Sequence, residues 1–178
     1  MSNLVAYVDG GSLGNPGPSA IGVVIEGSEA GKITIAKRIG HQDNNVAEYV
    51  ALLEALQCAV TLRAKALHVY SDSEVMVKQM RGEYACRSPR LYSLHWICRK
   101  LARSFAFSIS HVPREHNTEA NGLASSAVRR HTAKLTFADT VCGLPPNSHS
   151  PCRHHDYPPA GLGLVIYKPI SNRASGSP

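Results

Sequence analysis

The sequence lacks the marks of a membrane-spanning or secreted protein. It has no apolar run long enough to cross a bilayer as a helix. Its start, Met1-Ser2-Asn3, shows neither the basic region nor the apolar region of a secretory signal. The five cysteines are odd in number and include no Cys-x-x-Cys pair, so a disulfide scaffold is not expected. We therefore expect a cytoplasmic protein that does not bind membranes.

The composition is that of a globular protein. Hydrophobic residues make up 43% of the 178 residues and charged residues 18%, which excludes wholesale disorder. The length allows one domain with an appendage but hardly two full cores. Lys and Arg number 19 against 13 Asp and Glu, and the resulting net charge of +6 fits a nucleic-acid partner without establishing one.

The composition changes near residue 131. Residues 131–178 hold seven Pro, four Gly and five Ser and show little helical periodicity. This content predicts a C-terminal extension over 131–178 that is irregular or partly docked, with one candidate strand at 163–167. Residues 1–130 are predicted to form the folded domain.

Strand and helix patterns follow one another through residues 1–130. Apolar and β-branched runs predict strands over 4–9, 21–26, 32–39, 67–70 and 105–112. Helical periodicity predicts helices over 44–62, 73–81, 89–104 and 118–130. Asn44 or Asn45 is expected to cap the first helix. The order β-β-β-α-β-α-α-β-α indicates an α/β domain whose first three strands form a meander.

Three acidic residues are expected to meet at one edge of the predicted sheet. Asp9 and Asp72 each end a predicted strand, and Glu48 lies in the first turns of the first helix. If the first and fourth strands are parallel neighbours, both aspartates emerge where α/β proteins usually bind ligands. Converging carboxylates repel one another unless a hard cation such as Mg²⁺ or Mn²⁺ lies between them. The pattern therefore favours a metal site.

Four segments, in order, carry a resemblance to a known family. They are YVDGGSLGNPGP (7–18), NNVAEYVAL (44–52), YSDS (70–73) and HVPREHNTEANGLA (111–124). The sequence resembles type 1 ribonuclease H in these motifs, over about residues 4–130. The resemblance implies a ribonuclease H-like fold, with a five-stranded mixed sheet (a three-strand meander, then two parallel strands) flanked by helices. It also implies hydrolysis of the RNA strand of RNA–DNA hybrids to 3′-hydroxyl and 5′-phosphate products.

The same resemblance implies a catalytic centre with two Mg²⁺ or Mn²⁺ ions, held by Asp9, Glu48, Asp72 and residue 121. The family normally has an aspartate where this sequence has Asn121. The amide offers an oxygen without a charge, so we interpret the chain as an active enzyme that needs more Mg²⁺ than usual or prefers Mn²⁺. Arg114 is the first candidate for contacting the scissile phosphate and His116 the second, although a loop-stabilising hydrogen bond would explain either residue. The alternative function is a hybrid-binding module without catalytic activity. The chain could also be a domain of a reverse transcriptase or another polyprotein, which would have the same chemistry.

The resemblance also implies residues that contact the substrate. Gly10 and Gly11 would let the backbone approach the RNA 2′-hydroxyls, although a tight turn explains them as well. The polar partners would be Ser12, Asn15, Asn44 and Asn45.

One predicted helix and one unusual acid bear on how the hybrid is held. On the helix 89–104, Trp96 and Arg99 share a face with other cations, which suits a nucleic-acid backbone, although a solvated face is an equal interpretation. Asp43 stands where the family commonly has a threonine that contributes to a DNA-phosphate pocket, so the acid must point away or assist a nearby base. We expect an RNA–DNA hybrid as the partner of a monomer, with no obligate protein partner.

Overall fold

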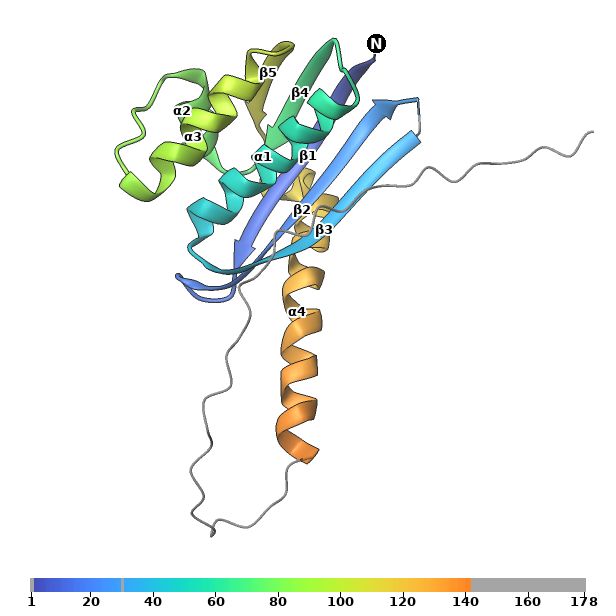
Figure 1. The fold of residues 1–178 in the computed structure, drawn as a ribbon, viewed down its shortest axis with the longest axis vertical. Coiled ribbons are helices and arrows are strands. Elements are labelled where there is room, and N and C mark those ends of the chain that lie inside the picture. Colours follow the sequence, from blue (N-terminus) through green and yellow to red (C-terminus); the bar gives the residue numbers. More distant parts are fainter. Residues whose placement is uncertain (1, 30, 142–178) are drawn as a thin grey trace, which may run out of the picture. The chain divides into compact units, whose positions relative to one another are not determined.

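Residues 2–29 and 31–141 are described by a computed structural model (Figure 1). The strands are β1 (Asn3–Ser12), β2 (Gly17–Ser28), β3 (Gly31–Gln42), β4 (Ala66–Ser71) and β5 (Ala106–His111). The helices are α1 (Asn44–Thr61), α2 (Glu74–Arg81), α3 (Pro89–Ala102) and α4 (Thr118–Val141), and a short 3₁₀ turn covers Arg114–His116. The element order is the predicted one.

The strands form one mixed sheet in the order β3-β2-β1-β4-β5. β1, β2 and β3 pair antiparallel as a meander, whereas β1 pairs parallel with β4 and β4 parallel with β5. The predicted fold class is therefore confirmed. Because β1 and β4 are parallel neighbours, their carboxyl ends meet at the same edge of the sheet, which is where Asp9 and Asp72 lie.

Alternation along β1 assigns its side chains to two faces of the sheet. Leu4, Ala6 and Val8 are buried in the main core with the apolar face of α1. Asp9 points to the opposite face and is paired in the ladder with Gly22 of β2. A Cβ atom at Gly22 would collide with the backbone of α4 at Ala120, so this glycine lets α4 pack directly on the sheet beside Asp9.

The first three strands are longer than predicted, and two helix ends also differ from the sequence expectations. The cap of α1 is Asp43 rather than Asn44 or Asn45, because Asp43 Oδ1 accepts a hydrogen bond from the Val46 N–H (2.9 Å). The last helix runs to Val141 and not to Arg130. No glycine or proline interrupts the chain between Gly122 and Gly143, so the turn formers counted from residue 131 begin only after this helix. The rest of the predicted extension, including the candidate strand at 163–167, lies outside the described residues.

Helix α3 shows how far periodicity predicts burial. Leu91, Cys98 and Ala102 are buried as a stripe against the core. Ile97 of the same helix is apolar but 38% exposed, so not every apolar residue of α3 is buried. Within the described residues, no helix is both long and apolar enough to span a membrane.

Candidate active site

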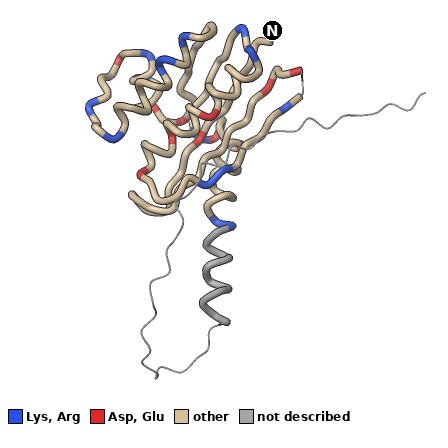
Figure 2. The backbone as a smooth tube through the Cα atoms, in the orientation of Figure 1, with Lys and Arg blue, Asp and Glu red and all other residues tan. Residues whose placement is uncertain are grey.

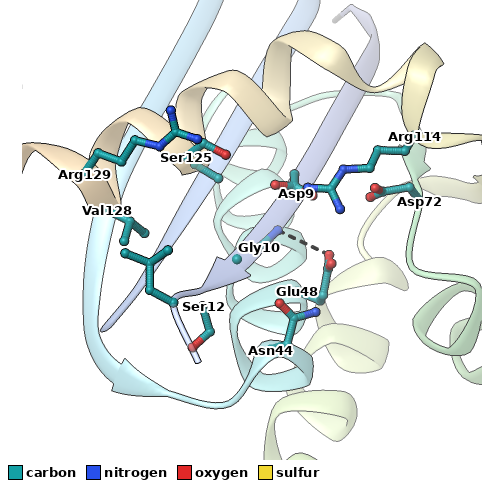
Figure 3. Close-up of a pocket in the computed structure, with 13 residues that line it drawn as sticks. Asp9, Gly10, Ser12, Asn44, Glu48, Asp72, Arg114, Ser125, Val128 and Arg129 are labelled. Atoms are coloured by element: carbon teal, nitrogen blue, oxygen red, sulfur yellow. Dashed lines mark hydrogen bonds between the residues drawn. The ribbon is translucent and has the colours of Figure 1, made fainter. Parts of the chain in front are cut away.

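Three carboxylates from three elements meet at the carboxyl edge of the sheet (Figure 3). Asp9 comes from β1, Glu48 from the second turn of α1, and Asp72 from the position directly after β4. One carboxylate oxygen of each lies within 4.8 Å of the others. Asp9 and Glu48 are both 5% exposed. The predicted triad is therefore brought together, with the oxygen donors that a hard divalent cation prefers.

Gly10 positions Glu48. A Cβ atom on Gly10 would collide with the backbone of α1 at Ala47 and Glu48, so the helix approaches the strand this closely because residue 10 has no side chain. The Gly10 N–H then donates a hydrogen bond to Glu48 Oε2 (3.3 Å). Close approach of α1, rather than a positive φ, is thus what requires glycine here, since the positive φ in this loop belongs to Gly14.

Burial and mutual repulsion make the carboxylates reluctant to ionise. Burial, followed by the charge of Asp72, raises the pKa of Asp9 from 3.8 to about 6, although Arg114 acts in the opposite direction. Burial, followed by the charges of Asp9 and Asp72, raises the pKa of Glu48 well above its usual value. The Gly10 N–H and Arg114 oppose that shift. Such a cluster gains most from a bound cation, which removes the repulsion.

Asn117 holds Asp72 in place, a role that the sequence analysis missed. Its Nδ2 donates to the Val8 carbonyl (2.9 Å) and to Asp72 Oδ1 (3.2 Å), so one amide ties the end of β4 to the end of β1. Asn117 is 1% exposed and its Oδ1 has no partner among the described residues. The signal available in the sequence was an amide three residues after Arg114 at the start of the last helix, but a helix cap explains that residue type equally well.

Asn121 lies one turn further along α4 and faces Arg114. The Asn121 amide satisfies both of its ends when its oxygen accepts hydrogen bonds from Arg114 Nε and Nη2, the latter at 2.7 Å, and its nitrogen donates to Ser125 Oγ (3.2 Å). Arg114 in turn lies beside the carboxylates and lowers the pKa of Asp9 and Glu48. The predicted fourth ligand therefore contacts Arg114, which lines the carboxylate pocket, but Asn121 is not itself a lining residue and its oxygen is engaged by the guanidinium.

Known proteins share the sequence pattern and the fold of this chain. The family described as reverse transcriptase-like matches residues 7–127. Ribonuclease HI of Halobacterium salinarum is 38% identical over 125 residues, which cover 69% of this chain and 63% of that protein. The crystal structure of ribonuclease H1 from the same organism superposes with a TM-score of 0.68 at 36% identity, covering 72% of this chain and 98% of the crystallised chain. The chain belongs to the ribonuclease H family.

Two further relatives have domains of the same kind. The bifunctional protein Rv2228c of Mycobacterium tuberculosis is 38% identical over 128 residues, 70% of this chain but 35% of that protein. The structure of LC11-RNase H1 in complex with an RNA/DNA hybrid superposes with a TM-score of 0.67 at 33% identity. The match covers 73% of this chain and 99% of the LC11 chain. This chain therefore spans 63% of the halobacterial protein and 35% of the mycobacterial one.

The carboxylates open into a pocket of about 270 Å³ (Figure 3). Of the predicted substrate-contacting residues, Gly10, Gly11, Ser12 and Asn44 line it. Asn15 and Asn45 are not among its lining residues, and Asn15 Oδ1 instead accepts a hydrogen bond from the Asn44 N–H (3.1 Å). Missing from the sequence analysis are the α4 residues of the pocket wall, namely Ala124, Ser125, Val128 and Arg129. Their spacing from Asn121 by three, four, seven and eight residues is the helical signal that could have identified them.

Trp96 and Arg99 lie apart from the carboxylates. They line a separate pocket of about 300 Å³ on the outer side of α3, together with Tyr92, His95, Lys100 and Arg103. Trp96 is 54% exposed, and Lys100 Nζ lies 5.1 Å from the centre of its ring. Figure 2 shows basic positions recurring along the segment that contains α2 and α3. This face offers an aromatic surface with cations beside it.

Asp43 has two partners. Besides capping α1, it forms an ion pair with Arg90 at the start of α3, with Oδ2 3.8 Å from Nη1. The acid therefore assists a neighbouring base, which was one of the two outcomes expected from the sequence. Arg90 is the more exposed partner, with 75% of its side chain accessible.

Proposed function

We propose that this chain is an endoribonuclease that hydrolyses the RNA strand of RNA–DNA hybrids and leaves 3′-hydroxyl and 5′-phosphate ends. The observation that carries the proposal is the meeting of Asp9, Glu48 and Asp72 within 4.8 Å at the end of β1. Membership of the ribonuclease H family and the hybrid bound by LC11-RNase H1 support the substrate class.

The residues fit a pair of divalent cations, which we propose to be Mg²⁺ or Mn²⁺. Asp9, Glu48 and Asp72 supply oxygen donors with raised pKa values at Asp9 and Glu48, and Asn121 supplies a neutral amide oxygen nearby. Bound cations would neutralise the phosphate charge and lower the pKa of a water molecule. Three carboxylates, two divalent cations and one phosphate sum to zero charge, so binding is electrostatically reasonable even without a fourth acid.

The protein's own groups perform the remaining tasks. Asn117 orients Asp72, and the Gly10 N–H orients Glu48, so both carboxylates are held before substrate binds. Arg114 carries the positive charge closest to the cluster and is our candidate for holding the scissile phosphate and assisting its release. Because Asn121 brings no charge, we expect a higher requirement for metal than in relatives with an aspartate at this position.

The hybrid would lie across the pocket and the amino ends of α1 and α3. No heavy atom lies within 4 Å of the place a Cβ on Gly11 would take, so a ribose can approach the backbone there, with Ser12 and Asn44 beside it as partners for the 2′-hydroxyl. We place Asn15 and Asn45 in the same group through their positions next to Asn44. Trp96 and Arg99 would bind a more distant part of the backbone.

A labelled hybrid, incubated with series of Mg²⁺ and Mn²⁺ concentrations, tests the function. Wild type should cleave the RNA strand, and Asp72→Asn should reduce the rate by at least about a hundredfold. Glu74→Gln is the matched control, because Glu74 is an exposed acid that pairs with Lys78 on α2 and lies outside the cluster. Equal rates for wild type and Asp72→Asn would refute the proposed active centre.

A second candidate function is a hybrid-binding module without catalysis. The observation that favours it is the engagement of Asn121 by Arg114, which occupies the oxygen of the fourth ligand position. Tight hybrid binding by wild type without cleavage at any concentration of either metal would support this alternative. In both cases we propose that the protein is cytoplasmic and monomeric. Sedimentation analysis of the isolated chain tests the monomeric state.

A further inference from the structure

The carboxylate pocket continues along α4 to a basic residue with no assigned role. Ser12 at the end of β1 and Leu13 directly after it line one side, and Ser125, Val128 and Arg129 of α4 line the other. Figure 3 shows Ser12 and the three α4 residues. Residues 121, 125 and 129 are four apart and share one helix face. Arg129 is therefore about 12 Å along the helix from Asn121, at the end of the pocket away from the carboxylates.

The acidic residues of this pocket lie at one end, and one of its two basic residues lies at the other. The described lining residues include three acids, Asp9, Glu48 and Asp72, and two cations, Arg114 and Arg129. Arg114 is engaged at the carboxylate end by Asn121. Arg129 takes part in none of the ion pairs found among the described residues. Neither arginine forms an ion pair among the described residues, but Arg114 has Asn121 as a hydrogen-bond partner, whereas Arg129 has no side-chain partner there.

The neighbouring arginine points elsewhere. Arg130 Nε donates to the Ser126 carbonyl (3.3 Å) and its Nη2 to Ser126 Oγ (3.4 Å), both one turn back on the outer face of α4. Arg130 does not line the pocket. The two consecutive arginines are both exposed, yet one faces the pocket and the other faces solvent.

We propose that Arg129 binds a phosphate of the RNA strand, away from the scissile phosphate, and so fixes the strand along the face of α4. This inference rests on the proposed function, since it assigns the strand in the pocket to the RNA that the carboxylates cut. An Arg fork on a phosphate provides charge-assisted hydrogen bonds and releases a counterion. The strand would then be held at both ends of the pocket.

Hybrid binding by Arg129→Ala and Arg130→Ala tests the proposal. A fluorescently labelled hybrid is titrated in EDTA, so that binding is measured without cleavage. Arg129→Ala should weaken binding about tenfold and reduce the slope of log Kd against log salt by about one. Arg130→Ala should stay within about twofold of wild type. Arg129→Lys should keep part of the affinity that Arg129→Ala loses. An equal loss of affinity in Arg129→Ala and Arg130→Ala would overturn the assignment.

A series of hybrids with a single uncharged methylphosphonate linkage identifies the phosphate. Wild type should lose affinity when one particular RNA-strand linkage is neutralised, and Arg129→Ala should show no further loss at that linkage. Sensitivity at a DNA-strand linkage instead would overturn the strand assignment. If wild type binds and cleaves hybrid while Arg129→Ala behaves like Arg130→Ala, this inference fails alone. If wild type binds the hybrid no more tightly than duplex DNA and does not cleave it, the proposed function fails.

Discussion

With the Asn121 amide oriented so that both of its ends have partners, the guanidinium of Arg114 donates from Nε and Nη2 to the side-chain oxygen of Asn121. An amide oxygen has two lone pairs, so these two hydrogen bonds use its whole accepting capacity. A cation that takes Asn121 as a ligand must therefore compete with Arg114. We therefore expect Asn121 to bind a cation less tightly than a carboxylate would, because the amide carries no charge and because its oxygen already has a partner.

Asn121→Asp should lower the metal concentration that gives half-maximal cleavage by about tenfold, because it adds a negative charge beside the cluster. Cleavage rates measured over Mg²⁺ and Mn²⁺ series, with calorimetric titration of Mn²⁺ alone, give the shift. Asn121→Ala serves as the companion variant, and it should need more metal than wild type if the amide oxygen is a ligand. An unchanged metal titration in Asn121→Asp would contradict this account.

Asn117→Ala should weaken Mn²⁺ binding by about 10- to 100-fold, because Asp72 loses the amide that holds it beside β1. The variant also leaves the buried Val8 carbonyl without this partner and should lower the free energy of unfolding by about 1–3 kcal/mol. Calorimetry with Mn²⁺ and urea unfolding in EDTA measure the two effects separately. Asn45→Ala, at an exposed amide outside the cluster, should leave Mn²⁺ affinity unchanged. A stability loss without a loss of Mn²⁺ affinity would reduce Asn117 to a purely structural residue.

The carboxylate cluster was predictable from the sequence because the ends of strands can be recognised where an apolar run stops. Asp9 and Asp72 terminate apolar runs, and parallel pairing of β1 with β4 then brings them together. Contacts made by amides and arginines were harder to predict, because they depend on side-chain rotamers across three elements. Nothing local to Asn117 or Arg129 distinguishes a cap or a solvated cation from a residue of the site.

The errors at the ends of elements have the same physical origin. Asp43, Asn44 and Asn45 all have side chains suited to capping, so residue type alone does not say which of them begins the helix. In the structure it is Asp43, whose carboxylate accepts the Val46 N–H.

Asp9→Asn should stabilise the protein in EDTA above pH 6. The pKa of Asp9 is raised from 3.8 to about 6 in the folded state, so the folded chain binds more protons than the unfolded chain between these values. The free energy of unfolding therefore falls as the pH rises from 3.8 to about 6, because Asp9 ionises less readily in the folded chain. A shift from 3.8 to about 6 corresponds to at most about 3 kcal/mol at pH 8. Asparagine does not titrate and avoids this cost.

Urea unfolding of wild type and Asp9→Asn at pH 4 and pH 8, without metal, measures the difference. The gain from Asp9→Asn should be present at pH 8 and absent or reversed at pH 4. Saturating Mn²⁺ should stabilise wild type far more than the variant, because the variant lacks a ligand. A difference between the two proteins that does not change with pH would show that Asp9 ionises normally in the folded state.

Two adjacent glycines offer a test of how the fold builds the site. Gly10→Ala should lower the free energy of unfolding by about 1–3 kcal/mol, because its methyl group collides with the backbone of α1 at Ala47 and Glu48. Gly11→Ala should have little effect on stability, because no heavy atom lies within 4 Å of the position its Cβ would take. Thermal and urea unfolding of both variants give the comparison. Since the Gly10 N–H also binds Glu48, displacement of α1 should weaken Mn²⁺ binding in Gly10→Ala as well. Equal stability in the two variants would mean that α1 can move away from β1 without cost, and that Glu48 is not positioned by this close approach.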